Sequence, residues 1–311
     1  MINSYNEWDP LKRVIVGTAS HANWPVGDLV YRNEAKNSLW TETPAPSGPV
    51  PQWIIDETEE DLSLLCSTLV DLGVEVIRPQ PMDFQKLDGL YNYCPRDRLL
   101  VHGNTVVDTA MMYPCRDMEI LSYYKVIGEL RLTPENFKSM PRGQGLVLDA
   151  ANVLRLGSDK MLFLESASGN RAAYDWLCQQ FPAVDIELCN FYAGVHIDST
   201  IVPIREGLVL LNGSRVNEGN CPKVFRDWEK LYVDDVVPQD FYQYPYASKW
   251  IALNMLVVDS NTVICDTGQI GLHRILEQQG FTVIPLTLRH SRTLGGGFHC
   301  VTLDLLREHN K

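Results

Sequence analysis

One pattern recurs along the chain: an apolar strand, a short polar turn and a second apolar strand. Its copies cover residues 99–107, 153–164, 201–211 and 255–265. The turns carry Gly, Asn and Asp, which tolerate the backbone dihedral angles that hairpins require. Successive copies begin about 50 residues apart, and a period of this size is typical of repeated supersecondary units. The sequence therefore predicts a fold built from a series of similar modules.

Further elements are predicted between and before the hairpins. Helices are predicted at about 168–180, 223–232 and 269–279, and strands at 184–188 and 281–284. A first unit is predicted from a strand, an amphipathic stretch and a second strand, at 12–16, 57–72 and 74–77. About five ββαβ modules of this kind would cover one another's apolar faces in a closed or capped arrangement. No low-complexity linker divides them, so residues 1–311 are predicted to form a single α/β domain.

The segment 33–52 interrupts this regularity. It is rich in Asn, Thr and Ser and contains four prolines, Pro44, Pro46, Pro49 and Pro51. A loop of this length within a compact domain is either mobile or functional. One hypothesis is that the segment forms a flap over a pocket.

Charge and hydropathy exclude several classes of partner. The formal net charge is −12 and no cluster of Lys and Arg occurs, which argues against nucleic acid, because phosphate binding needs a basic stripe. No apolar run approaches the roughly 18 residues that a membrane helix needs. The first residues resemble neither a signal peptide nor a transit sequence, so the cytoplasm is the expected location. Small molecules are the expected partners, and the choice between a monomer and a homodimer stays open.

The eight cysteines include no C-x-x-C pair, so the usual spacing of a zinc site is absent. Most of them are expected to be small buried side chains in a reducing compartment. Cys300 differs, because Gly295, Gly296 and Gly297 precede it and allow the backbone to pass close to a ligand. The glycines predict that Cys300 faces a pocket. The adjacent His299 is a tempting general base, but neighbours on a strand point to opposite faces, which favours a structural role.

His196 and Asp198 form a second group of candidate residues. If this segment is extended, both side chains lie on the same face. They could be metal ligands, although no third ligand is evident nearby, or a polar pair at a strand end. They could also act as a general base and a cation-binding carboxylate beside a nucleophile such as Cys300. Taken singly, Asp149 is an ordinary turn residue and Asp97 an ordinary surface ion-pair residue.

Taken together, these segments resemble the amidinotransferase family. The motifs occur in the family's order: SYNEWDPL at 4–11, PRD at 95–97, DAA at 149–151, HID at 196–198, SKW at 248–250 and GGGFHC at 295–300. The last motif is the most specific, and the resemblance runs nearly end to end. It implies an α/β propeller of the pentein type with five modules and pseudo-fivefold symmetry, which agrees with the repeat.

The resemblance also implies three catalytic and four substrate-binding residues. These are Cys300 as the nucleophile, His196 as the general acid and base, Asp149 as its carboxylate partner, Asp97 and Asp198 for the guanidinium, and Arg215 and Ser248 for the α-carboxylate of an amino acid. The implied reaction moves the amidino group of arginine through a covalent amidino-cysteine to an amine and releases ornithine. No metal or organic cofactor is implied.

Two departures from the family pattern point to an acceptor larger than glycine. The segment between about Arg131 and Asp149 is shorter than in the glycine-using enzymes, and Val195 stands where a bulkier residue is expected. Two alternatives remain beside the transferase. One is a guanidino-modifying hydrolase of the same superfamily, an arginine deiminase or dihydrolase, and the other is a binding protein on this fold without activity.

Overall fold

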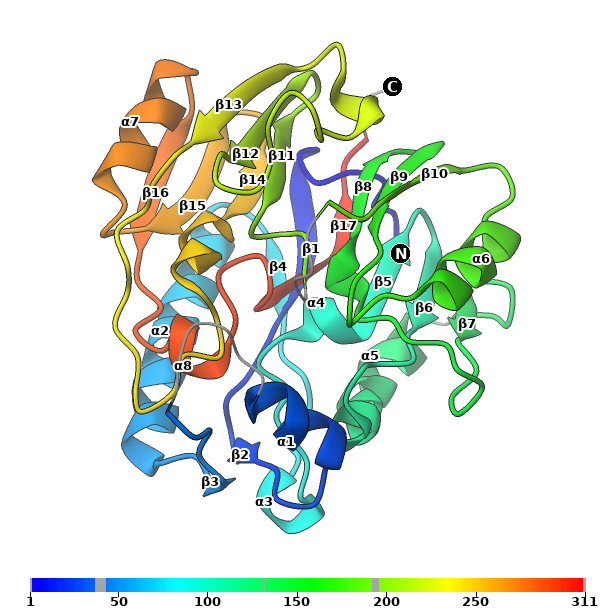
Figure 1. The fold of residues 1–311 in the computed structure, drawn as a ribbon, viewed down its shortest axis with the longest axis vertical. Helices are drawn as coiled ribbons and strands as arrows, with labels where there is room; N and C mark the ends of the chain where they lie inside the picture. Colours follow the sequence, from blue (N-terminus) through cyan, green and yellow to red (C-terminus); the bar gives the residue numbers. More distant parts are fainter. Residues whose placement is uncertain (1, 37–42, 131, 192–195, 310–311) are drawn as a thin grey trace.

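The computed structural model describes residues 2–36, 43–130, 132–191 and 196–309. Within these ranges, five three-stranded sheets share one topology. In each sheet the central strand pairs antiparallel with one neighbour and parallel with the other. Figure 1 shows the sheets following one another around the molecule in sequence order. The predicted five-module α/β propeller is confirmed.

The predicted hairpins are present as antiparallel strand pairs, each continued by a parallel third strand. The sheets are β5 (Leu99–His102), β6 (Thr105–Asp108) and β7 (Phe137–Ser139); β8 (Val153–Gly157), β9 (Lys160–Leu164) and β10 (Asp185–Cys189); β11 (Ile201–Arg205), β12 (Leu208–Asn212) and β13 (Glu229–Val233); and β14 (Leu256–Asp259), β15 (Thr262–Asp266) and β16 (Thr282–Leu286). A small extra sheet joins β2 (Asn23–Trp24) to β3 (Gly48–Pro49).

Helices connect the strands. They are α1 (Leu29–Lys36), α2 (Gln52–Asp71), α3 (Phe84–Leu87), α4 (Pro95–Arg98), α5 (Tyr124–Glu129), α6 (Arg171–Gln180), α7 (Ile270–Gln278) and α8 (Ser291–Leu294), with 3₁₀ turns η1 (Pro114–Tyr123), η2 (Ala150–Asn152), η3 (Lys223–Phe225) and η4 (Lys249–Leu253). Helices α2, α6 and α7 lie on the outside of the molecule, whereas α4 is buried near its centre (Figure 1). Within the described ranges, no helix has the length and apolar character needed to cross a membrane.

The first sheet is completed by a strand from the other end of the chain. β1 (Leu11–Val16) pairs in parallel with β4 (Glu75–Ile77) and antiparallel with β17 (Thr302–Arg307). In Figure 1, β1 in blue and β17 in red lie side by side near the middle of the view. The chain therefore closes on itself, and β17 covers the edge of β1 that β4 leaves unpaired.

One predicted helix is wrong. Of residues 223–232, only the first three form the turn η3, and β13 begins at Glu229. β13 pairs with β12 along five residues, so its backbone groups are satisfied by the sheet. Its end, Tyr232 and Val233, consists of residue types that favour strands. The parallel strand of this module therefore follows the hairpin without an intervening α-helix.

The segment predicted as a flap is only partly described. Its beginning lies in α1, β3 pairs with β2, and α2 starts at its last residue. Residues 37–42 lie outside the described residues, so the flap stays a prediction.

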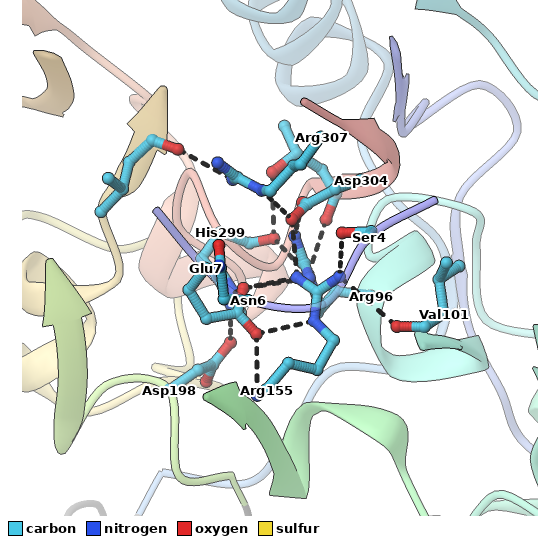
Figure 2. Close-up of polar contacts among 12 residues, drawn as sticks. Ser4, Asn6, Glu7, Arg96, Val101, Arg155, Asp198, His299, Asp304 and Arg307 are labelled. Carbon is cyan, nitrogen blue, oxygen red and sulfur yellow. Dashed lines mark hydrogen bonds and ion pairs between the residues drawn. The ribbon is translucent and has the colours of Figure 1, made fainter. Parts of the chain in front are cut away.

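A group of buried charges joins the modules at the centre, and we call it the central ion cluster. It consists of Glu7, Arg96, Arg155, Asp304 and Arg307, all at most 4% exposed. Arg155 of β8 lies 2.5 Å from Glu7 and 2.6 Å from Asp304, and Arg307 lies 2.6 Å from Asp304. Arg96 of α4 also pairs with Asp304 (Figure 2). The N-terminal segment, two modules and the closing strand thus meet in one polar network.

Candidate active site

Cys300 lies at the end of a turn between α8 and β17. Gly295 ends α8 with φ of 79°, a left-handed conformation that favours glycine. A Cβ on Gly297 would come within 2.8 Å of the carbonyl oxygen of Asn254, so the two segments approach closely here only because the residue is glycine. The side chain of Asn254 accepts a hydrogen bond from the backbone N of Cys300 at 2.9 Å. This turn fixes the position of the Cys300 thiol.

His196 lies between two carboxylates from other segments. Its Nε2 is 3.1 Å from Asp149 Oδ2, and its Nδ1 is 3.6 Å from Asp97 Oδ1. Asp149 precedes η2, and its other oxygen accepts from the backbone N of Met112 at 2.9 Å, which holds the carboxylate in place. One polar atom each from Asp97, His196 and Cys300 lies within 4.8 Å of the others. The expected convergence of Cys300, His196 and Asp149 is therefore observed.

Asp97 is a buried site residue rather than a surface one. Its Oδ2 pairs with Arg116 at 2.8 Å, whereas its Oδ1 has no hydrogen-bond partner. Burial raises the pKa of Asp97, and the nearby His196 and Arg116 only partly offset this. Asp97, His196 and Cys300 together offer the O, N and S atoms that could also hold a metal ion.

Asp198 contacts the thiol from another side. Its Oδ2 accepts from Cys300 Sγ at 3.3 Å and from His299 Nδ1 at 2.7 Å. The other ring nitrogen of His299 is 3.3 Å from Glu7 Oε2 (Figure 2). Asp198 and His299 lie in turns, and His196 directly precedes the bend that leads to Asp198, so the reasoning from strand faces was wrong for both segments. His196 lies between Asp97 and Asp149 and also near the Cys300 thiol, which Asp198 contacts directly.

The two groups expected to move protons have shifted pKa values. Burial alone would lower the pKa of His196, but the carboxylates of Asp97 and Asp149 outweigh it and hold the pKa well above its usual value. A hydrogen bond with the thiol of Cys94, burial and the Asp198 carboxylate raise the pKa of Cys300 well above its usual value. Near neutral pH, both directions favour the protonated forms, an imidazolium for His196 and a neutral thiol for Cys300.

Cys94 is a neighbour of the thiol that the sequence did not reveal. It is fully buried, immediately before α4, and its thiol is hydrogen-bonded with that of Cys300. A Cβ on Gly296 would lie 2.5 Å from Cys94 Sγ, so the glycine leaves room for this sulfur. Nothing in the sequence indicates the contact, because about 200 residues separate Cys94 from Cys300 and the tertiary fold alone brings them together.

The two residues expected to hold an α-carboxylate make local contacts. Arg215 Nη1 donates to Thr200 Oγ1 at 2.8 Å, which places it beside the segment that carries Asp198. Ser248 caps η4, where its Oγ accepts from the backbone N of Trp250 at 3.3 Å. Both side chains are half-buried, and their roles stay predictions.

The rim expected to differ from glycine-using enzymes is described only in part. Val195 and Arg131 lie outside the described residues. Within the segment that follows Arg131, Arg142 lies 2.8 Å from both carboxylate oxygens of Asp108 and 3.1 Å from Asp117. These contacts tie this part of the chain to β6 and η1.

No protein-family model matches the chain. Inosamine-phosphate amidinotransferase 1 of Streptomyces griseus is 41% identical to it over an alignment that spans 99% of this chain and 97% of that protein. The chain belongs to the amidinotransferase family. The match extends along the chain as the ordered motifs predicted, and the protein is an amidinotransferase.

Further comparisons agree with membership in the amidinotransferase family. Mitochondrial glycine amidinotransferase of Xenopus laevis is 27% identical over 98% of this chain and 82% of that protein. The solved structure of the inosamine-phosphate amidinotransferase from S. griseus has a TM-score of 0.93 and 39% identity, covering 100% of this chain and 98% of that one. DDAH from Pseudomonas aeruginosa, at 14% identity and a TM-score of 0.67, shares the pentein fold.

Proposed function

We propose that this amidinotransferase takes the amidino group of arginine onto Cys300, releases ornithine and passes the group to an amine larger than glycine. The observation that carries the proposal is the convergence of a thiol, an imidazolium and three carboxylates in one buried site. Cys300 would be the nucleophile, His196 the proton donor and acceptor, and Asp149 the group that orients His196.

Two carboxylates would bind the guanidinium of the donor. Asp97 Oδ1 is buried without a hydrogen-bond partner, which a guanidinium N–H would supply. Asp198 lies against the thiol, so a guanidinium paired with it would have its carbon near Cys300 Sγ. Paired charge-assisted hydrogen bonds hold a planar guanidinium in a fixed orientation. Arg215 and Ser248 would bind the α-carboxylate of arginine.

The cationic donor would activate the thiol that it reacts with. In the free site, the charge of Asp198 contributes to the raised pKa of Cys300. A bound guanidinium offsets this charge and favours the thiolate, so the thiol loses its proton to the solvent as the donor binds. The thiolate then attacks the guanidino carbon and forms a tetrahedral adduct.

His196 would complete both halves of the reaction. Its raised pKa keeps it protonated near neutral pH, as a general acid requires. It donates its proton to the side-chain nitrogen of arginine, the bond from that nitrogen to the guanidino carbon breaks, and ornithine leaves. The amidino group stays on Cys300. His196 then accepts a proton from the incoming amine, which attacks the amidino carbon and expels the Cys300 thiolate.

Incubation with arginine is expected to give ornithine without citrulline. An amidinotransferase breaks the bond to the side-chain nitrogen, whereas a deiminase releases ammonia and leaves citrulline. Rapid quenching followed by peptide mass spectrometry should find Cys300 heavier by about 42 Da, the mass that an amidino group adds when it replaces the thiol hydrogen. Omitting arginine is the control. Citrulline as the main product would support the hydrolase alternative instead.

The acceptor is proposed from the pattern of relatives. The chain is 41% identical to an enzyme named for inosamine phosphate and 27% identical to one named for glycine. We therefore expect an inosamine phosphate to accelerate ornithine release more than glycine does at equal concentration. Equal acceleration by glycine would contradict an acceptor larger than glycine.

A further inference from the structure

His299 is buried between two carboxylates directly behind the thiol. Its Nδ1 lies 2.7 Å from Asp198 Oδ2, the same oxygen that accepts from Cys300 Sγ. Its Nε2 lies 3.3 Å from Glu7 Oε2. With a carboxylate oxygen at each ring nitrogen, both nitrogens have an acceptor to donate to, and only the imidazolium carries a proton on each. The geometry therefore selects the charged form of the ring.

The surroundings of His299 strengthen these contacts. Figure 2 shows the ring of His299 beside Glu7, with Asp198 on its other side. A small pocket next to them is lined by Glu7, Asp198 and His299 together with apolar side chains of β8, β11 and β14. Among apolar neighbours, charges interact more strongly than in water, and an unpaired carboxylate is costly.

Charged groups from several segments face His299 and Asp198. Glu7 is itself paired with Arg155 of β8 and approached by Arg96 of α4, and Asp198 also faces the cationic His196. Arg96 and burial both lower the pKa of His299, but hydrogen bonds and charge from Asp198 and Glu7 outweigh them and raise it. The two carboxylates therefore determine the direction in which the pKa of His299 shifts, in agreement with the geometry.

We propose that His299 is a permanently charged positioning residue, held by Glu7, that keeps Asp198 ionised beside Cys300. Asp198 is then a fixed anion for the guanidinium and does not take up the thiol proton. The role deepens the proposed function, because it concerns the same donor site. In this proposal Glu7 of the N-terminal motif holds His299 in place. Because Glu7 is also part of the central ion cluster, it connects the donor site to that cluster.

The alternative fate of Asp198 shows why the charge on His299 matters. Burial alone would raise the pKa of Asp198, whereas the hydrogen bond and charge of His299 lower it below its usual value. Without that cation, the raising effect of burial remains and the pKa of Asp198 rises. Asp198 is an anion only above its own pKa. As the solution is acidified, a protein without the charge on His299 would therefore lose its affinity for a guanidinium at a higher pH than the unaltered protein does.

The charge can be measured in the free protein. Spectra of protein labelled with ¹⁵N-histidine should show both ring nitrogens of His299 protonated at about pH 8, where an ordinary histidine with a pKa near 6.5 is neutral. The resonance is assigned by its absence in His299→Gln. A neutral ring at that pH would overturn the proposal, whether or not arginine is a substrate.

The consequence can be measured with His299→Gln, which keeps an amide N–H donor between the two carboxylates but carries no charge. We expect the acid limb of kcat/KM for arginine to move to higher pH, with a rise in KM that is largest at low pH. His273→Gln is the matched control, because His273 is half-buried on α7 and contacts the backbone of Asp266 at 2.8 Å. It should leave the profile unchanged.

The outcomes separate this inference from the proposed function. An unmoved acid limb in a folded His299→Gln protein would mean that a hydrogen bond suffices and would overturn the role of the charge. If the unaltered protein fails to process arginine while His299 is an imidazolium at about pH 8, the donor assignment fails and the charged His299 stands.

Discussion

Cys300→Ser is expected to reduce amidino transfer by on the order of a thousandfold or more while the protein stays folded. A serine hydroxyl scarcely ionises near neutral pH, whereas the thiol is within reach of ionisation once a cation offsets Asp198. Because the proposed route passes through a bond to this atom, the substitution removes the route itself. Initial rates of ornithine formation, with thermal melting as a check on folding, test this.

Cys178→Ser provides the control for the loss of a thiol as such. Cys178 is half-buried on α6, away from the turn that carries Cys300. Its replacement should leave the rate within about twofold, because substitutions away from special features change little. Wild-type turnover in Cys300→Ser would rule out the covalent intermediate.

Arg155→Met is expected to destabilise the protein by about 3–5 kcal/mol, the cost of breaking a buried ion pair by removing one partner. Arg155 is 1% exposed and holds Glu7 and Asp304 at 2.5 and 2.6 Å. Methionine fills similar space, so the loss comes mainly from the carboxylates left without this partner. Urea unfolding curves measure the change in the free energy of unfolding.

An exposed ion pair gives the matched comparison. Arg171 lies 3.2 Å from Asp175 within α6, and both side chains are more than half exposed. Arg171→Met should change the free energy of unfolding by less than about 1 kcal/mol, because water screens such pairs. Equal changes in the free energy of unfolding would show that Arg155 in the central ion cluster contributes no more to stability than an exposed ion pair does.

The repeated hairpins were predictable because their signal is local. Each is an apolar run, a turn rich in Gly, Asn or Asp, and a second apolar run, and all of these became strand pairs at the predicted places. The helix predicted at 223–232 was wrong because the spacing of apolar residues in this segment suits both the period of a helix, about 3.6 residues, and that of a strand, about two. The segment contains a strand because β13 pairs with β12, and this contact exists only in the assembled sheet.

The candidate site was predictable where motifs mark it and not where contacts define it. Three glycines before Cys300 indicated a turn, and the structure has one, but the Cys300 thiol that this turn was predicted to present to a pocket is buried, with 2% of the residue exposed. The neighbours of Cys300 were missed, because Cys94 has no distinguishing context. His299 meets Glu7 across 292 positions of sequence, a contact that no local pattern encodes. The alternation of faces along a strand was also applied to His196, Asp198 and His299, none of which lies in a strand.

The pairing of β17 with β1 has a consequence for the protein during its synthesis on the ribosome. β1 emerges before its antiparallel neighbour β17, which begins at Thr302, so one edge of β1 stays unpaired while the residues between the two strands are synthesised. An unpaired edge of this kind is prone to wrong pairing, which favours protection by chaperones during that interval. Cys300 emerges just before the same strand. A nascent chain that has not yet reached Cys300 holds the other proposed site residues but lacks the thiol proposed as the nucleophile.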